Sequence, residues 1–187
     1  MPDLGIKRKV DSYKKKILIS QTRKDKALSD LVYNFLLFNS FPAEEILYSN
    51  CDSHLSRIPD DVPIFDYLRD FFVNSYSDQK IFVFFITSEN IISSFGTMAE
   101  IGAAWITQID HRIFNINEFQ PNKPLNNDRT WHTTKIDAEG KISMDTINAD
   151  IFCKRIAEIC TYFGYVPKDD ETNMTYLKSQ IEILSNA

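Results

Sequence analysis

The sequence predicts an α/β protein with a flavodoxin-like, doubly wound and mostly parallel sheet and a C-terminal helical extension. Two observations lead to this fold class. Short apolar runs of strand length, such as residues 17–20 and 81–86, alternate with segments whose apolar residues recur every three or four positions. At 187 residues, with 43% hydrophobic content, the chain can fill the core of one ordinary domain. Strands that alternate with helices are joined by right-handed crossovers, which build a parallel sheet.

The first two units follow in order along the chain. Residues 17–20 predict a buried strand, and the segment from Thr22 to Asp25 fits a capping pattern that opens a helix. Residues 45–48 predict a second strand, and residues 49–62 a long polar loop. Pro63 then opens a helix with apolar residues at helical spacing, namely Ile64, Phe65, Leu68, Phe71 and Phe72.

The third unit holds the strand at 81–86 and a helix near 97–109. We expect Met98, Ile101, Trp105 and Ile109 on the buried side of this helix. Glu100 would then share a face of little bulk with its small neighbours, which are Gly96, Thr97, Ala103 and Ala104.

The remaining chain predicts one more strand, a hairpin and two helices. The strand spans 111–116, residues 117–128 are irregular, and residues 133–144 form a small hairpin that turns at Glu139 and Gly140. A helix from 147 to 163 stops at Gly164, and the apolar spacing of residues 174–184 predicts a last helix. We expect that last helix to dock on the domain or on a second copy of the chain.

Composition and charge predict how the chain is divided into segments and which classes of function they argue against. We expect a flexible basic leader at residues 1–14, one domain at residues 15–165 and the helical extension at residues 166–187. The basic residues near the start are interpreted as a solvated tail, with a phosphate or partner contact as the alternative; they are Lys7, Arg8, Lys9, Lys14, Lys15 and Lys16. The net charge of −5 argues against non-specific nucleic-acid binding. Because the chain has neither a membrane-spanning run nor an apolar signal region, we expect a cytoplasmic protein without a membrane partner.

Cysteines and histidines do not predict a disulfide or a metal site. Cys153 and Cys160 are seven residues apart on one expected helix, about 10 Å of rise, which is too far for a bridge. His54, His111 and His132 lack metal-ligand spacing, and no paired cysteine accompanies them.

Three segments are expected to meet at the carboxyl edge of the sheet, where open α/β sheets bind ligands. The first is the turn from Ser20 to Asp25, whose Gln21, Thr22, Arg23 and Lys24 could accept an anion at a helix start, although ordinary capping explains them equally well. The second is the loop at 50–62, which carries Asp60. The third runs from Thr87 to Trp105 and contributes Ser94, Phe95, Thr97 and Glu100. For Glu100, a first-turn glutamate favoured by the helix dipole is the structural alternative.

These segments together resemble a bacterial TIR (Toll/interleukin-1 receptor) domain. The resemblance rests on residues 17–25, on residues 46–61 and on the run Glu100-Ile-Gly-Ala-Ala-Trp105, and it covers about residues 15–116. It implies the flavodoxin-like fold and, in many bacterial members, cleavage of NAD⁺ between nicotinamide and ribose. In one departure, members often place an aromatic residue four positions before the glutamate, where this chain has Gly96, with Phe95 one position earlier.

The resemblance also implies roles for single residues. Glu100 would be the catalytic carboxylate, and Ser20, Gln21 and Thr22 correspond to the first-strand turn of the substrate site. The loop at 50–62 would gate the site and mediate self-association together with neighbouring helices. Bacterial relatives commonly act in anti-phage defence, some by making a cyclic ADP-ribose-type signal that a downstream effector could sense. NAD⁺ would be a substrate, so no cofactor or metal is expected.

The chemistry agrees with a single carboxylate. Nicotinamide in NAD⁺ is cationic and departs neutral, so it needs no general acid, whereas ordinary glycosidases use two carboxyl groups. Glu100 would stabilise the oxocarbenium ion or capture C1′ covalently. Two alternatives stay open: residues 96–102 also resemble the motif of nucleoside 2-deoxyribosyltransferases, and the chain could be a non-catalytic TIR interaction module.

Overall fold

A central six-stranded sheet organises the fold of the computed structural model, which describes residues 14–73, 80–123, 125 and 130–185. The strands lie in the order β2-β1-β3-β4-β5-β6. They are β1 (Ile17–Ser20), β2 (Ile46–Leu47), β3 (Phe82–Thr87), β4 (Asp110–Ile116), β5 (Thr130–Ile136) and β6 (Ile142–Ser143). The first five are parallel, and only β6 runs antiparallel to its neighbour β5. The predicted mostly parallel α/β class is confirmed, and the order 2-1-3-4-5 is compatible with a flavodoxin-like fold.

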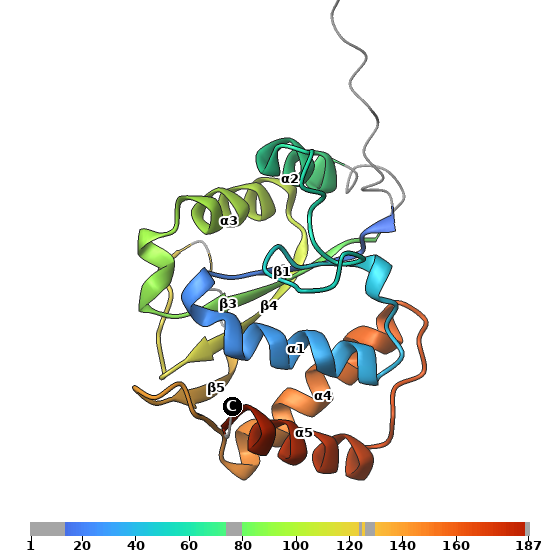
Figure 1. The fold of residues 1–187 in the computed structure, drawn as a ribbon, viewed down its shortest axis with the longest axis vertical. Coiled ribbons are helices and arrows are strands. Elements are labelled where there is room, and N and C mark those ends of the chain that lie inside the picture. The colour runs from blue at the N-terminus through green and yellow to red at the C-terminus, as the bar shows by residue number, and fades with distance from the viewer. Residues whose placement is uncertain (1–13, 74–79, 124, 126–129, 186–187) are drawn as a thin grey trace, which may run out of the picture.

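Helices cover both faces of the sheet and make three layers. In Figure 1, α2 and α3 lie above the sheet, whereas α1, α4 and α5 lie below it. The helices are α1 (Lys26–Phe38), α2 (Ile64–Val73), α3 (Phe95–Thr107), α4 (Thr146–Tyr162) and α5 (Asp170–Ser185). Along β3, Phe82, Phe84 and Ile86 pack toward the α1/α4/α5 layer, and Val83 and Phe85 toward the α2/α3 layer. Both faces of the strand are therefore apolar, as expected of a parallel strand between two helical layers.

The start of the domain departs from the basic-tail interpretation. Residues 1–13 lie outside the described part, but Lys15 is buried and its Nζ donates to the carbonyl oxygens of Ile46 and Leu55. Lys16 Nζ lies 2.8 Å from Glu45 Oε2. Placing Lys15 in a solvated tail was wrong, because this ammonium satisfies backbone carbonyls that β2 and the following loop leave open.

The connection from β1 to α1 also differs in detail from the capping prediction. A short 3₁₀ turn, Arg23–Asp25, precedes α1, and Thr22 makes no capping hydrogen bond to a backbone N–H. Its hydroxyl instead donates to Asp25 Oδ2 at 2.7 Å. The Asp25 carboxylate is thereby held at the edge of the sheet, and the α-helix begins at Lys26.

Helix α3 is rotated relative to the sequence prediction. Its buried positions are Thr97, Ile101 and Ala104, whereas Met98 is 48% and Trp105 is 65% exposed. Of the four expected buried residues, Ile101 and Ile109 are buried, and the placement of Met98 and Trp105 was wrong. The stripe differs by one residue, about 100° around the helix. The small Ala104 and Thr97 let the helix approach the sheet, and Glu100 borders this buried stripe.

The C-terminal part forms as predicted and packs on the domain. The hairpin turns at Gly140, whose φ is +84°, and α4 ends before Gly164, whose φ is +85°. Strand β5 spans Thr130–Ile136, so it begins three residues before the predicted start of the hairpin at residue 133. Helix α5 buries Leu177 in the core shared with α1 and α4. The helical extension therefore docks on its own domain.

Candidate active site

Glu100 lies on α3 beside the carboxyl end of β1. Its carboxylate oxygen Oε2 accepts a hydrogen bond from the hydroxyl of Ser20, the last residue of β1. Burial raises the pKa of Glu100 to about 7, and the Ser20 hydrogen bond partly offsets that rise. A carboxyl group of this kind exchanges its proton near neutral pH, which is a property concentrated at functional sites.

A pocket of about 240 Å³ opens between α2 and α3 with Glu100 in its wall. Helix α2 contributes the larger side chains, and α3 contributes Glu100 among small ones. The lining residues are Phe65, Leu68, Arg69, Phe72, Val73, Ala99, Glu100, Ala103 and Thr107. Ala99 and Ala103 flank the glutamate with little bulk, so a ligand in the pocket can approach the carboxylate.

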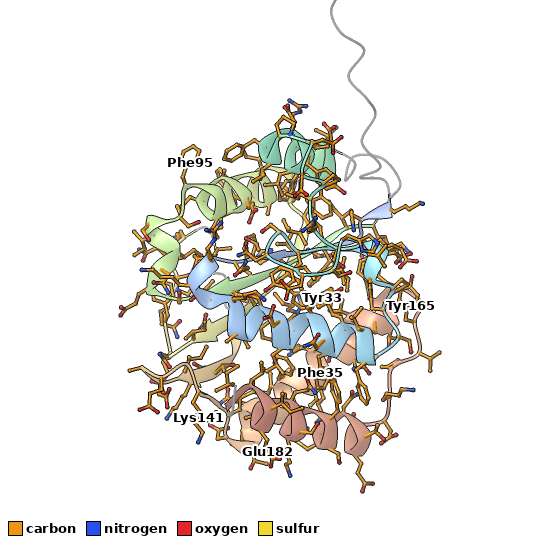
Figure 2. The ribbon with its side chains drawn as sticks, viewed as in Figure 1. Tyr33, Phe35, Phe95, Lys141, Tyr165 and Glu182 are labelled. Atoms are coloured by element: carbon orange, nitrogen blue, oxygen red, sulfur yellow. The ribbon has the colours of Figure 1, made fainter. Side chains whose placement is uncertain are left out.

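Phe65, which lines this pocket, forms an aromatic pair with Phe95, which does not line it. Phe65 is half exposed and its ring centroid is 5.9 Å from that of Phe95, in an edge-to-face arrangement. Phe95 itself is 79% exposed, and Figure 2 shows it at the outer surface near α2 and α3. Phe95 was predicted to belong to the site. It does not line the Glu100 pocket and contacts Phe65 of α2, which does.

Ser94 and Thr97 anchor the start of α3 and do not line the pocket. Ser94 Oγ caps the helix by accepting the backbone N–H of Thr97 at 3.3 Å. The Thr97 hydroxyl is buried, lies 2.7 Å from Ser94 Oγ and donates to the Gln21 carbonyl oxygen at 3.3 Å. These bonds tie the first turn of α3 to the turn that follows β1, and so help to set the position of Glu100.

The residues of the expected anion-binding turn do not lie together in one pocket. Gln21 is buried, and its Nε2 has no hydrogen-bond partner among the described residues. Arg23 and Lys24 are exposed, and Lys24 lines a second pocket of about 360 Å³. Among these turn residues, Ser20 is the one whose side chain is hydrogen-bonded to Glu100.

The second pocket contains a polar cluster that sequence reasoning did not assign. Asp25 is 3% exposed, and its carboxylate accepts hydrogen bonds from Thr22, from Ser88 Oγ at 2.8 Å and from Asn90 Nδ2 at 2.9 Å. Asp25, Ser88 and Asn90 all follow the carboxyl ends of β1 and β3, where the strand order reverses. The position of polar residues just after these two strands was the available signal.

The loop at 50–62 is partly built into the fold, and the structure does not bring Asp60 to Glu100. Ser56 is fully buried and its hydroxyl donates to the Ala43 carbonyl oxygen at 2.7 Å. Ile58 belongs to the core beneath α2 and α3. Asp60 is exposed, pairs with Arg57 at 3.1 Å, and is not among the residues that line the Glu100 pocket.

Sequence reasoning missed the α2 side of the site. Phe65 and Phe72 were assigned only as apolar positions of a helix, and Arg69 was not considered. Arg69 lines the pocket and forms ion pairs with Asp66 at 2.8 Å and with Asp70 at 3.3 Å. Nothing in the local pattern of α2 connects these residues with Glu100, which follows them by more than 25 positions.

The described ranges contain neither a metal-binding cluster, nor a membrane-spanning helix, nor a disulfide. Within them no cluster of three or more His, Cys, Asp or Glu side chains could hold a metal ion. None of their helices is both long and apolar enough to cross a membrane. Cys51, Cys153 and Cys160 are free and buried.

Comparison with known proteins shows a partial likeness to another protein and assigns no family. The chain matches no known protein-family profile. Over 106 residues, or 57% of this chain, it is 29% identical to the protein YddK of Bacillus subtilis (strain 168). That relative is named as uncharacterized. The match spans 37% of YddK, so the chain corresponds to little more than a third of it. The TIR resemblance stays a prediction.

Proposed function

We propose that the chain cleaves NAD⁺ between nicotinamide and ribose, as a TIR-like NAD⁺ nucleosidase with Glu100 as its catalytic carboxylate. The observation that carries the proposal is the Glu100 carboxylate, which lines the α2–α3 pocket and has its pKa raised by burial to about 7. A second feature supports it: the aromatic side chains Phe65 and Phe72 line the same pocket.

The reaction requires one negatively charged group close to the reacting carbon, C1′ of the ribose. The bond between C1′ and the pyridinium nitrogen breaks, its electron pair leaves with neutral nicotinamide, and positive charge develops on the ribosyl ring. Ionised Glu100 stabilises that charge electrostatically or bonds to C1′. Water then attacks C1′ and loses a proton to give ADP-ribose, whereas attack by a nucleophile of the same molecule gives a cyclic product.

The pocket suits one end of the substrate. Its volume of about 240 Å³ is smaller than the roughly 300 Å³ at which pockets for drug-sized ligands begin. It would therefore enclose the nicotinamide and part of the ribose, while the diphosphate and adenosine extend along the surface. A cationic pyridinium ring is attracted to aromatic side chains, which Phe65 and Phe72 supply. Arg69 lines the pocket and would bind a phosphate oxygen once it exchanges its exposed pairing with Asp66 or Asp70.

Nicotinamide release tests the proposal. Concentrated protein is incubated with NAD⁺, and the products are identified by mass spectrometry, for the natural chain, Glu100→Gln and the control Glu89→Gln. Glu89 is exposed on the 3₁₀ turn before α3 and does not line the pocket. We expect Glu100→Gln to lose at least about 100-fold in rate, as removal of a group that stabilises transition-state charge commonly does. Equal turnover by Glu100→Gln and the natural chain would refute the catalytic role.

The same measurement separates the alternatives. Base exchange on deoxynucleosides with no turnover of NAD⁺ would indicate a 2-deoxyribosyltransferase, and absence of both reactions in assembled protein would indicate an interaction module. Self-association through the loop at 50–62, a downstream effector, a role in antiviral defence and a cytoplasmic location belong to the proposal and stay predictions.

A further inference from the structure

The hydroxyl of Ser20 is placed to act on Glu100 and not on a ligand. Ser20 is only 1% exposed and does not line the α2–α3 pocket, so a substrate in that pocket cannot touch it. Its backbone is fixed in the sheet, where it pairs with Phe85 of β3. The only side-chain group that it contacts by a hydrogen bond in the described chain is Glu100 Oε2.

Because of this contact, the two oxygens of the carboxylate differ in their hydrogen bonding. Oε2 accepts the Ser20 hydroxyl, whereas Oε1 accepts no hydrogen bond from any residue that the structure describes. Oε1 is thus the oxygen left for a ligand. Ala99 and Ala103, which flank Glu100 in the pocket wall, offer no polar group that could restrain the carboxylate from α3.

We propose that Ser20 is a positioning residue for the catalytic carboxylate, which it holds by one oxygen so that the other faces the α2–α3 pocket. This assignment rests on the proposed function and replaces the substrate-contact role that the TIR resemblance implied for Ser20. A hydrogen bond from a fixed strand restricts the rotation of a long side chain, which otherwise costs free energy when the site is assembled.

The bond also affects the charge of the carboxylate. Burial raises the pKa of Glu100, and a donor that prefers the ionised form lowers it again. From α2, the charged residue in the lining of the same pocket is Arg69, which is already paired with Asp66 and Asp70. From β1 the neighbour is uncharged Ser20, and the pocket wall of α3 contains no further ionisable residue. Without the Ser20 hydroxyl, Glu100 would remain protonated to a higher pH.

A carboxyl titration tests this without any substrate. The side-chain carboxyl carbon of Glu100 is followed by NMR in ¹³C-glutamate-labelled protein and assigned by its loss in Glu100→Gln. We expect Ser20→Ala to raise the midpoint by about one pH unit, since a hydrogen bond to a charged group contributes about that much. Ser20→Thr, which keeps the hydroxyl, should return it toward the natural value. Ser29→Ala is the control, because Ser29 is equally buried and does not contact Glu100.

Kinetics then separate a positioning role from a merely structural one. In Ser20→Ala, the acid limb of kcat should move to higher pH by the same amount as the midpoint, so that kcat at pH 6 falls about tenfold, while KM for NAD⁺ changes little. Ser20→Cys keeps the volume with a weak donor, should behave like Ser20→Ala, and takes its place if the alanine variant does not fold. An unchanged carboxyl midpoint in both variants would overturn the proposal. Because the titration needs no turnover, it decides the role of Ser20 even for a protein that leaves NAD⁺ intact.

Discussion

Replacing Glu100 by glutamine should stabilise the folded protein, and the gain should grow with pH. The Glu100 carboxyl group has a pKa of about 7 in the folded chain and an ordinary value of 4.5. The folded state therefore binds more protons than the unfolded state between these pH values, and the contribution of Glu100 to stability is lost as pH rises through about 7. Glutamine resembles the protonated acid and has no charge to lose.

The magnitude follows from the two pKa values. At about 1.4 kcal/mol per pKa unit, an ionised Glu100 destabilises the fold by roughly 3 kcal/mol at pH 8 and by less than about 1 kcal/mol at pH 5. Since Glu100 keeps some solvent exposure, we expect the observed difference between pH 5 and pH 8 to be about 1–3 kcal/mol. A destabilising charge of this kind is the usual cost of an active-site group.

Urea unfolding at pH 5, 6, 7 and 8 measures this difference for the natural chain and Glu100→Gln. Comparing the two proteins at each pH cancels the titration of all other groups. The exposed Glu89→Gln variant should show a difference that is small and independent of pH. A Glu100→Gln variant that is no more stable than the natural chain at pH 8, or whose advantage shrinks as pH rises, would refute the argument that Glu100 is ionised at a cost.

Three further predictions concern the pocket, the loop and the last helix. Phe65→Ala should raise KM for NAD⁺ about tenfold through loss of a stacking ring worth 1–2 kcal/mol, whereas the similarly exposed Ile64→Ala, outside the pocket, should not. Ile58→Ala should lower the unfolding free energy by about 2–4 kcal/mol because Ile58 is a core residue. The exposed Pro59→Ala should be nearly neutral in stability, so a change in mass by light scattering in that variant alone would bear on self-association. Leu177→Ala should cost about 2–4 kcal/mol with a single unfolding transition, and a separate early transition would show that α5 unfolds independently.

The sequence predicted most elements because their signals are local. The apolar runs gave β1 and β3, and the three-four spacing gave α1, α2, α4 and α5. Glycines, which have positive φ in the structure, marked the turn of the hairpin and the end of α4. The boundaries were less accurate. Thr22 fits a capping pattern, yet it donates to Asp25, because a buried carboxylate needs donors more than the helix start needs a cap.

The candidate site was predictable only in its central residue. Glu100 was identified from its small neighbours and its place after β3, but Asp60 and Arg23 were grouped with it on the assumption that all segments at one sheet edge meet. The structure separates them, since Asp60 pairs with Arg57 and Arg23 is exposed away from the pocket lining. The orientation of α3 was predicted wrongly because Met98 and Trp105 are large and apolar and were therefore expected to be buried. Hydrophobicity gives the preference of a residue for burial, and it contains no information on how closely a helix can approach its sheet.

By itself the sequence determined the α/β class, the order of its elements and a carboxylate at the carboxyl edge of β1 and β3. Only the tertiary structure decided that α2 and α3 enclose a pocket at Glu100, that Phe65 and Arg69 line it, and that Ser20 holds the carboxylate. The reason is physical. Periodicity and backbone sterics act over a few residues, whereas the environment that sets the pKa of Glu100 comes from side chains on β1 and α2 that approach it through packing across the sheet.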